Sequence, residues 1–454
     1  MSEASLERMS NDVDVVIVGA GAAGIAAAIE LQSTNLSFLV LEARNRIGGR
    51  AYTDEETFTS IPIDLGASWI HSYGPENVFY DYHESFNVNE KKYRIGKYGI
   101  CFDYDGQHFT SETIFHAQII YEKIYQHLEL FSYNIKNNED LSIEQVIQSE
   151  YDRLVTDGPI KRLVNLMLSG EEQYEGSNLT DLSAKSHGLG SDSAYDQWVS
   201  FGYGNLLECI AKKHNLSVRL NTFVTHINTT DMNRIAIKTS NDSSIIYCRR
   251  VIITIPLGCL KHETIVFEPR LPDWKRNAIN QMGMGLMNKL IVQFPNSFWD
   301  SDIASFSHAC NERRGRFRFT ICLSSPANIL ILFVTGKFAS ELESLTDNQI
   351  LEQIMKFLRQ IFSKITIPDP INYKFTRWGQ DSLAYGSYSN FAVHTGLHTI
   401  EQLAKETSDG RVQWAGEHAN VNDGTEDWSY ACVHSAFQSG QRAAKTIRNQ
   451  LCSS

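Results

Sequence analysis

A glycine-rich segment near the N-terminus has the residue spacing of a phosphate-binding turn. Gly19, Gly21 and Gly24 stand between an apolar run at residues 13–18 and an alanine-rich run that predicts a helix. The first glycine makes a tight turn, the second lets the backbone approach a pyrophosphate, and the third lets the helix pack on the strand. Glu42 ends the next apolar run, where a carboxylate accepts hydrogen bonds from a ribose diol. The pattern predicts a site for an ADP-containing cofactor, with phosphate at a helix N-terminus.

A basic stretch with two adjacent glycines follows Glu42. It contains Arg44 and then, after three residues, Gly48-Gly49-Arg50. Adjacent glycines allow the chain to come close to a bound ligand, and the guanidinium groups of Arg44 and Arg50 present paired donors that match phosphate oxygens. A surface arginine cluster on a turn is the alternative.

Two titratable side chains stand in unusual local sequence. Lys289 lies inside an apolar run at residues 286–294, and lysine is rarely buried without a partner. Burial lowers the pKa of a lysine, which suits proton exchange or oxygen chemistry. His71 ends the segment 64–71, and an imidazole can change its charge near neutral pH. Taken alone, each residue also fits a structural role.

These motifs together resemble those of the flavin-dependent amine oxidases, a group that includes polyamine oxidases, monoamine oxidases and lysine demethylases. Gly48-Gly49-Arg50 is similar to the signature that continues the group's first fingerprint, and segment 64–71 is similar to the one beside the flavin in polyamine and spermine oxidases. Lys289 matches the lysine that reaches flavin N5 through a water, and His71 matches a histidine in the amine channel. The resemblance extends from Val13 to Ala443 and implies FAD as the cofactor.

The C-terminal third continues the resemblance. Trp378 and Tyr388 stand in segments similar to those that face the flavin in this group. Gly416 and Glu417 match the last strand of its FAD domain, whose acid accepts a hydrogen bond from the ribityl chain. The resemblance also places the backbone of Val224 at the adenine.

Two residues near the start of the last helix depart from the family pattern. Cys432 stands where some relatives place an aromatic wall, which puts a two-sided aromatic clamp in doubt. Ser435 replaces the usual glycine, and its Cβ is expected to narrow the approach of the backbone. No cysteine lies between residues 323 and 431, where monoamine oxidases attach their flavin, so non-covalent FAD is predicted.

The candidate site is a set of residues drawn from these motifs. The predicted catalytic residues are Lys289 and His71, and the predicted substrate-binding residues are His71, Tyr388, Glu171, Glu172 and Cys432. Glu171 and Glu172 lie in a loosely matched zone where relatives place an acid for a distant ammonium, and solvated surface acids are the preferred interpretation of this pair taken alone. No metal site is predicted. The predicted cofactor-binding residues are Gly19, Gly21, Ala23, Gly24, Glu42, Ala43, Arg44, Gly49, Arg50, Gly66, Ala67, Ser68, Trp69, Val224, Trp378, Gly416, Glu417 and Val433.

Interleaved strands and helices must position these residues. The first 41 residues predict a strand, helix and strand at 13–18, 22–32 and 37–41, which is a βαβ unit. Residues 112–168 have helical periodicity. Further strands are expected at 217–227, 250–255, 286–294, 329–335 and 411–414, and a last helix at 434–450.

The predicted fold class is α/β with two discontinuous domains. A Rossmann-like FAD-binding domain takes residues 10–80, 196–285 and 395–454. A substrate-binding domain with a mixed β-sheet and helices takes residues 81–195 and 286–394. The flavin is expected to lie across the interface between the two domains.

The composition disfavours several classes of function. The chain has 41 Lys and Arg against 53 Asp and Glu, a net charge of −12, which disfavours nucleic acid and favours a cationic ligand. The apolar runs are too short to span a bilayer, and the polar first residues are expected to be a frayed tail and not a signal peptide. The eight cysteines have no paired spacing, so a cytoplasmic protein with reduced thiols is expected. The oligomeric state stays open.

The preferred hypothesis is an FAD-dependent polyamine oxidase acting on spermine, spermidine or an acetylated form. It would oxidise the carbon beside a nitrogen to give an imine, which water hydrolyses to an aldehyde and an amine, while O2 becomes hydrogen peroxide. A relative of the lysine-specific histone demethylases ranks second, on the expectation that 454 residues leave no room for added domains. Other amine or amino-acid oxidases, and a flavoprotein scaffold with a decayed active site, are further alternatives.

Overall fold

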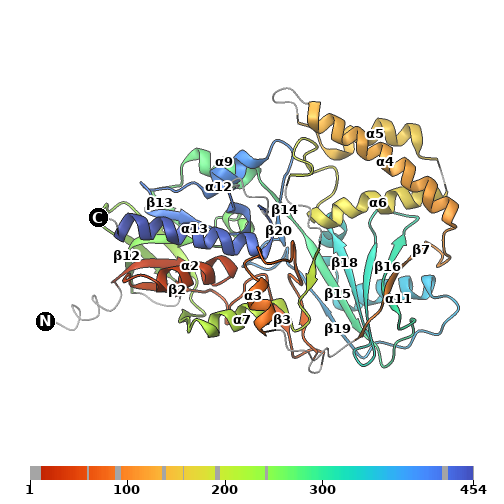
Figure 1. Cartoon of the computed structure of the whole chain (residues 1–454), viewed down its shortest axis with the longest axis horizontal. Coiled ribbons are helices and arrows are strands. Elements are labelled where there is room, and N and C mark those ends of the chain that lie inside the picture. The colour runs from red at the N-terminus through yellow and green to blue at the C-terminus, as the bar shows by residue number, and fades with distance from the viewer. Residues whose placement is uncertain are drawn as a thin grey trace.

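Two β-sheets lie at opposite ends of the long axis of the molecule (Figure 1). The computed structural model describes residues 12–58, 61–86, 94–134, 140–156, 158–189, 195–240, 244–421 and 428–452. Among these residues, no helix is both long and apolar enough to cross a membrane. All eight cysteines are unpaired.

The first sheet is assembled from distant parts of the chain. Its order is β13-β10-β11-β12-β1-β2-β9, and β21 pairs with β12. The central strand β1 is parallel to both β2 and β12, and Val15 to Val18 are buried because both faces of the sheet are covered. The strands are β1 (Asp12–Val18), β2 (Phe38–Leu41), β9 (Val218–Arg219), β10 (Val224–Asn228), β11 (Ile235–Thr239), β12 (Ile246–Ile253), β13 (Val266–Glu268) and β21 (Val412–Trp414).

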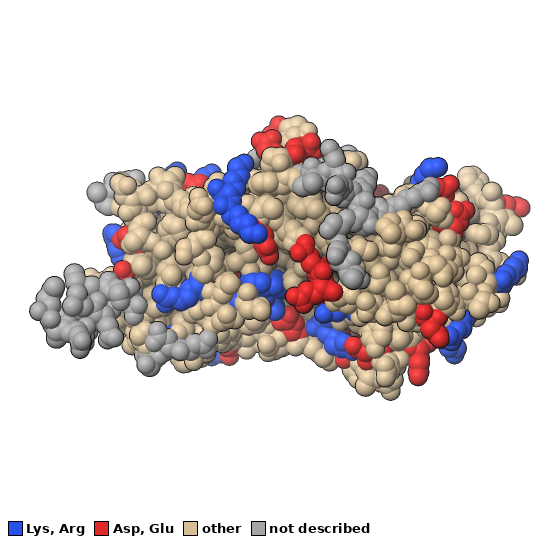
Figure 2. All heavy atoms as spheres, turned by 90° about the horizontal axis from the view of Figure 1, so that it is seen from below, with Lys and Arg blue, Asp and Glu red and all other residues tan. Residues whose placement is uncertain are grey.

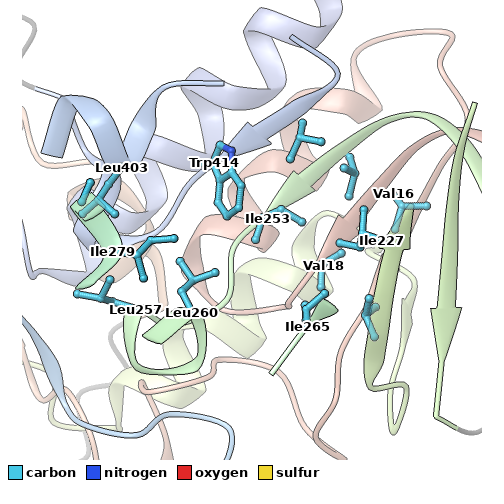
Figure 3. Packing of buried hydrophobic residues seen from close by; sticks show 14 of the residues in the cluster. Val16, Val18, Ile227, Ile253, Leu257, Leu260, Ile265, Ile279, Leu403 and Trp414 are labelled. Carbon is cyan, nitrogen blue, oxygen red and sulfur yellow. The ribbon is translucent and has the colours of Figure 1, made fainter. Parts of the chain in front are cut away.

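Helices cover both faces of this sheet. On one face α2 (Ala22–Gln32) and α13 (Val433–Cys452) lie against each other, and a Cβ added at Gly440 would stand 2.0 Å from the carbonyl oxygen of Ala23. The other face packs against α8 (Leu257–Lys261), α9 (Asp273–Gln281) and α12 (Leu397–Ala404). Figure 3 shows this packing, in which Trp414 and Ile253 of the sheet meet apolar side chains of the three helices.

The second sheet is mixed and has the order β19-β15-β18-β17-β16-β7, with β6 paired to β17. Alternate residues of β15 face opposite sides of the sheet. Leu290 and Val292 pack with α11 (Asp347–Ile361), whereas Ile291 packs with Leu65, and the same alternation turns Lys289 toward the first sheet. The strands are β6 (Arg94–Ile95), β7 (Tyr98–Asp103), β15 (Met287–Gln293), β16 (Ile303–Ala309), β17 (Phe319–Ser324), β18 (Ile329–Thr335) and β19 (Asn372–Phe375).

Three helices lie on the second sheet at the upper right of Figure 1, and they pack against one another. They are α4 (Ser111–Asn134), α5 (Ile143–Leu154) and α6 (Pro159–Glu175). The sequence of α6 explains both of its ends, because Pro159 occupies the first turn and Gly176 adopts the left-handed conformation with φ of 65° at the C-cap. The stretch 112–168, which has helical periodicity in the sequence, thus corresponds to three separate helices in the described structure.

Short two-stranded ribbons connect the parts between the two sheets. They are β3 (Thr53–Asp54) with β4 (Ile63–Asp64), β5 (Trp69–Ile70) with β8 (Gln197–Trp198), and β14 (Gly283–Gly285) with β20 (Tyr388–Asn390). The smaller helices α3 (Tyr80–Phe86), α7 (Tyr203–Lys213), α10 (Gly336–Glu343) and η1 (Glu417–Ala419) complete the described structure.

The expected α/β architecture and the βαβ start are present, with one correction. The predicted strand at 217–227 is two strands, β9 and β10, at different places in the first sheet. The strands of the first sheet fall inside the three predicted FAD-domain ranges, and those of the second sheet fall inside the two substrate-domain ranges. The division into two domains itself stays a prediction.

The net negative charge of the chain is not concentrated on the face that Figure 2 shows. The face in Figure 2 carries acidic and basic side chains next to one another. Elsewhere in the described structure, exposed charges also form ion pairs, such as Arg313–Glu341 and Arg249–Asp14.

Candidate active site

A cavity of about 710 Å³ lies between the two sheets. Val18 and Leu41, at the carboxyl ends of β1 and β2, line one part of it, and Lys289 and Phe333 of the second sheet line another. Its volume is typical of a pocket for a cofactor or a small ligand.

The glycine turn after β1 borders this cavity, and its three glycines have different reasons to be glycine. Gly19 has φ of +107°, which other residues rarely adopt. A Cβ at Gly24 would stand 1.9 Å from the carbonyl oxygen of Gly19, so this residue permits close packing of α2 and is absent from the cavity lining. A Cβ at Gly21 would meet no protein atom within 4 Å. Gly21 therefore leaves room in the cavity at the N-terminus of α2, where a phosphate is favoured.

Glu42 is buried beside this turn. Its carboxylate accepts hydrogen bonds from the backbone N–H of Ala20 at 2.7 Å and of Arg44 at 2.8 Å. Each carboxylate oxygen can accept more than one bond, so Glu42 keeps capacity for a ligand hydroxyl. The guanidinium of Arg44 has a protein partner that the sequence did not indicate, because its Nη2 lies 2.9 Å from both carboxylate oxygens of Asp381.

Arg50 and Glu417 form a buried ion pair in the wall of the cavity. Nη1 of Arg50 donates to Oε1 of Glu417 at 2.9 Å and to the carbonyl oxygen of Ser387 at 2.9 Å. Oε2 of Glu417 accepts from the hydroxyl of Ser389 at 2.5 Å. Burial alone would raise the pKa of Glu417, but Arg50, His418 and Ser389 outweigh it and the pKa is lowered. Glu417 is therefore a carboxylate at neutral pH.

The N-terminus of α13 opens onto the same cavity. Val433, His434 and Ala436 line it, and free N–H groups of a first helical turn favour electron-rich ligand atoms. Ser435 is not part of the lining, and its hydroxyl bonds the backbone of Cys432 at 2.7 and 3.1 Å. The expected narrowing by the Ser435 Cβ is therefore not found.

Lys289 is buried and makes three hydrogen bonds through Nζ. The acceptors are the carbonyl oxygens of Asp64 and Gly66, each at 2.7 Å, and Oγ of Ser68 at 2.6 Å. Burial lowers the pKa of Lys289, and the negative charge of Asp64 offsets only part of this effect. All three ammonium protons have protein acceptors, so a water-bridged contact to a cofactor would compete with one of these bonds.

His71 is held by an acidic residue that the sequence did not single out. Its Nδ1 lies 2.9 Å from Oδ2 of Asp196, and both residues line the cavity. An ionised Asp196 only accepts hydrogen bonds, which keeps the proton of a neutral His71 on Nδ1 and leaves Nε2 as an acceptor. Nε2 of the neighbouring His434 pairs with Oγ of Ser429 at 2.5 Å, and burial lowers the pKa of His434 to about 4.

Glu171 and Glu175, one turn apart on α6, line the same cavity as Lys289 and His71. Nδ1 of His187 lies 3.3 Å from Oε1 of Glu171, and the hydroxyl of Tyr430 donates to Oε2 of Glu175 at 3.2 Å. Asn390 anchors the end of α6 by donating to the backbone carbonyl of Glu175 at 2.9 Å. Burial, and then the charge of Glu171, raises the pKa of Glu175 to about 7.

Glu172 is a correction to the sequence analysis. It lies outside the cavity lining and is buried, with an exposed fraction of 4%. Its carboxylate pairs with Arg314 at 3.1 Å and accepts from the backbone N–H of Leu179 at 3.3 Å. Glu172 is neither a substrate ligand nor a solvated surface acid, because one residue along a helix turns the side chain by about 100° from Glu171.

Aromatic and sulfur-containing side chains complete the lining. The hydroxyl of Tyr388 donates to the carbonyl oxygen of Gln173 at 3.1 Å, and Nε1 of Trp378 donates to the carbonyl oxygen of Leu65 at 3.1 Å. Cys432, the residue before α13, also lines the cavity, and burial raises the pKa of its thiol to about 12.

The structure brings almost the whole predicted set together. Every predicted site residue lines the cavity except Gly24 and Glu172. The lining residues that sequence reasoning missed include the polar side chains of Glu175, His187, Asp196, Tyr430 and His434. Of these, only Glu175 carries a sequence signal, since it follows Glu171 by four residues in a helical stretch.

Comparisons with known proteins agree with this geometry. Residues 22–448 match the family described as flavin containing amine oxidoreductase. The chain is 28% identical to polyamine oxidase 5 of Oryza sativa subsp. japonica, over 96% of this chain and 88% of that protein. It is 30% identical to lysine-specific histone demethylase 1 homolog 1 of Arabidopsis thaliana, over 96% of this chain and 52% of that protein.

The fold is also similar to that of a solved structure. A putrescine oxidase redesigned in its cofactor binding superposes with a TM-score of 0.72 at 19% sequence identity, covering 96% of this chain and 99% of that one. The room at Gly21, the carboxylate of Glu42 and the N-termini of α2 and α13 suit a dinucleotide. The chain therefore belongs to the family of flavin-containing amine oxidoreductases, and it is an amine oxidase with FAD as its cofactor.

Proposed function

We propose that this protein is a polyamine oxidase that acts on spermine, spermidine or an acetylated polyamine. FAD, bound without a covalent link, supplies the acceptor for a hydride equivalent from the carbon beside a nitrogen, and O2 then takes the electrons to give hydrogen peroxide. The resulting imine is hydrolysed by water to an aldehyde and an amine. The similarity to a plant polyamine oxidase over most of both chains supports this assignment.

The residues that would hold FAD follow from the shape of the cavity. Gly21 and the N-terminus of α2 fit the pyrophosphate, and Glu42 fits a ribose diol. Arg50 balances the charge of Glu417, so Glu417 is not an unpaired buried charge. Its carboxylate can therefore accept a hydrogen bond from the ribityl chain.

The acidic pair Glu171 and Glu175 is the observation that supports a polyamine most directly. Both side chains line the same cavity as Lys289 and His71, and Tyr430 lies beside Glu175. Carboxylates and aromatic faces are the groups that hold an ammonium ion. A polyamine brings one nitrogen to react and others that stay charged, so the acids would bind a remote ammonium while the reacting nitrogen is neutral. His71, with Nε2 as an acceptor, would take a proton from the reacting nitrogen.

The basic residues of the cavity argue against an amino-acid oxidase. Such an enzyme needs a cation for the substrate carboxylate. Among the described residues that line the cavity, the only arginines are Arg44 and Arg50. Arg44 is paired with Asp381 and Arg50 with Glu417.

Anaerobic addition of spermine, spermidine and their acetylated forms tests the proposal. At least one of them should bleach the flavin absorbance within seconds, and admission of air should restore it with formation of hydrogen peroxide. Unchanged absorbance with every polyamine would refute the proposal. A methylated histone peptide belongs in the same panel, because faster turnover of that peptide would assign the protein to demethylase chemistry instead.

A further inference from the structure

A histidine of the protein already occupies a position beside the acidic pair. Nδ1 of His187 lies 3.3 Å from Oε1 of Glu171, and Nε2 lies 2.8 Å from the hydroxyl of Tyr125. The His187 side chain is only 5% exposed, and all three residues line the cavity. Tyr125 comes from α4 and Glu171 from α6, which pack together in Figure 1.

This arrangement lets His187 change its charge without moving. An ionised Glu171 only accepts, so Nδ1 of His187 carries a proton in both states. Nε2 accepts from the hydroxyl of Tyr125 when the ring is neutral and donates to the same oxygen when the ring is charged, because a hydroxyl can do either.

The groups that face His187 are mostly acidic. Glu171 and Glu175 face it from α6, Glu129 and Tyr125 from α4, and Lys185 of its own loop is exposed. Burial by itself would lower the pKa of His187, but the hydrogen bond to Glu171 and the three carboxylates outweigh burial and raise it. A cationic imidazole at this place neutralises part of the charge that a substrate ammonium would otherwise meet.

We propose that His187 is a specificity-determining residue that competes with the remote ammonium of the substrate for Glu171. With His187 charged, the amine end of the cavity attracts a polycation weakly. With His187 neutral, Glu171 and Glu175 are both available, and the cavity selects substrates with a second positive charge. The inference rests on the proposed function, because it concerns the amine end of the same cavity.

Two variants of opposite charge test this competition. His187→Gln removes the charge and keeps an amide N–H for Glu171, whereas His187→Lys makes the charge permanent. His214→Gln is the matched control. His214 also bonds a tyrosine hydroxyl, that of Tyr82 at 2.9 Å, but it lies outside the cavity lining.

The substrates are spermidine and N-propylbutylamine, which is spermidine without its two terminal amino groups. In the wild type, the KM for spermidine should fall with rising pH more steeply than that of the monoamine, between about pH 6 and about pH 8.5. His187→Gln should lower the KM for spermidine severalfold at the acidic end, because it removes a positive charge beside Glu171, and leave it nearly unchanged at the alkaline end. His187→Lys should keep this KM high throughout. The kcat values, the monoamine constants and the His214→Gln variant should follow the wild type.

A KM for spermidine in His187→Gln that equals the wild-type KM at about pH 6 would overturn the inference. The pH dependence by itself does not decide, because Glu175, with a pKa of about 7, titrates in both proteins. Failure of the proposed function looks different, since no polyamine would then reduce the flavin in the wild type. In that case calorimetric titration of the holoenzyme with spermidine, at the same pH values, applies the same criterion to its affinity in place of KM. A mere structural role of His187 would appear as lower thermal stability of both variants without the opposite shifts in KM.

Discussion

Replacement of Gly21 by alanine should abolish tight cofactor binding without harming the fold. A Cβ at this position meets no protein atom within 4 Å. Its φ of −74° is ordinary for alanine, so the variant carries no backbone strain. The apoprotein should unfold with a free energy equal to that of the wild type, or up to about 1 kcal/mol higher because alanine reduces the entropy of the unfolded chain.

The added methyl group lies where the backbone would approach a pyrophosphate. Displacing the phosphate from the N-terminus of α2 removes at least one hydrogen bond to a charged group, which is worth about 1.5 to 3 kcal/mol. This corresponds to a rise of about 10-fold to 150-fold in the Kd for FAD for each bond that is lost.

Gly24→Ala is the contrasting variant. Its Cβ would stand 1.9 Å from the carbonyl oxygen of Gly19, so α2 must move away from β1. Overpacking of this kind costs about 1 to 3 kcal/mol of stability. Gly24→Ala should therefore lower the thermal midpoint of the apoprotein, which Gly21→Ala should not.

Two measurements on the apoproteins decide the matter. FAD titration followed by quenching of flavin fluorescence gives Kd, and thermal unfolding followed by circular dichroism gives Tm. The reasoning is refuted if Gly21→Ala binds FAD as tightly as the wild type. It is also refuted if Gly21→Ala loses as much stability as Gly24→Ala.

Further predictions concern the charged groups of the cavity. Lys289→Met removes the donor of three buried hydrogen bonds and should lower the free energy of unfolding in urea by about 2 to 4 kcal/mol. It should also lower turnover in an oxygen electrode, and wild-type turnover would argue against a catalytic role. Because the pKa of Glu417 is lowered in the folded state, the unfolded chain binds more protons than the folded chain does as the pH falls. This carboxylate therefore stabilises the fold above its ordinary pKa of 4.5, and the stabilisation is lost as pH falls through the folded-state pKa. Glu417→Gln should remove that part of the acid dependence, as unfolding curves across this range would show. Asp196→Asn should lower kcat/KM in steady-state kinetics because it frees the tautomer of His71, and Asp196→Glu should restore much of the wild-type value.

The parts of the fold that were predictable are those that the local sequence determines. The run at β1, the alanine-rich α2 and Glu42 at the end of β2 lie within about 30 residues, and each is specified by its neighbours in the chain. The sequence predicts one strand at 217–227, and its division into β9 and β10 could not be predicted. The break follows from the different neighbours of the two strands in the sheet, which are β2 for β9 and β13 for β10. Tertiary pairing, and not local propensity, decides such a break.

The acidic end of the cavity was only half predictable for a similar reason. Glu171 and Glu172 are adjacent in sequence, and only the register of α6 decides that Glu171 faces the cavity while Glu172 meets Arg314. His187 reaches the acids from the loop that follows α6, and Tyr430 reaches them from the segment before α13. No pattern within one stretch of sequence connects residues that meet only after the chain has folded.

The position of α13 determines when the cofactor site is completed during synthesis on the ribosome. The phosphate-binding turn emerges early from the ribosome, whereas Gly416, Glu417 and Val433, which line the same cavity, emerge last. At about 5 to 20 residues per second, roughly 400 residues separate the two events by about 20 to 80 seconds. The nascent chain therefore holds a turn and a helix without their closing partner for most of its synthesis. We therefore expect FAD to bind late in synthesis, and we expect chains that end before α13 not to bind it.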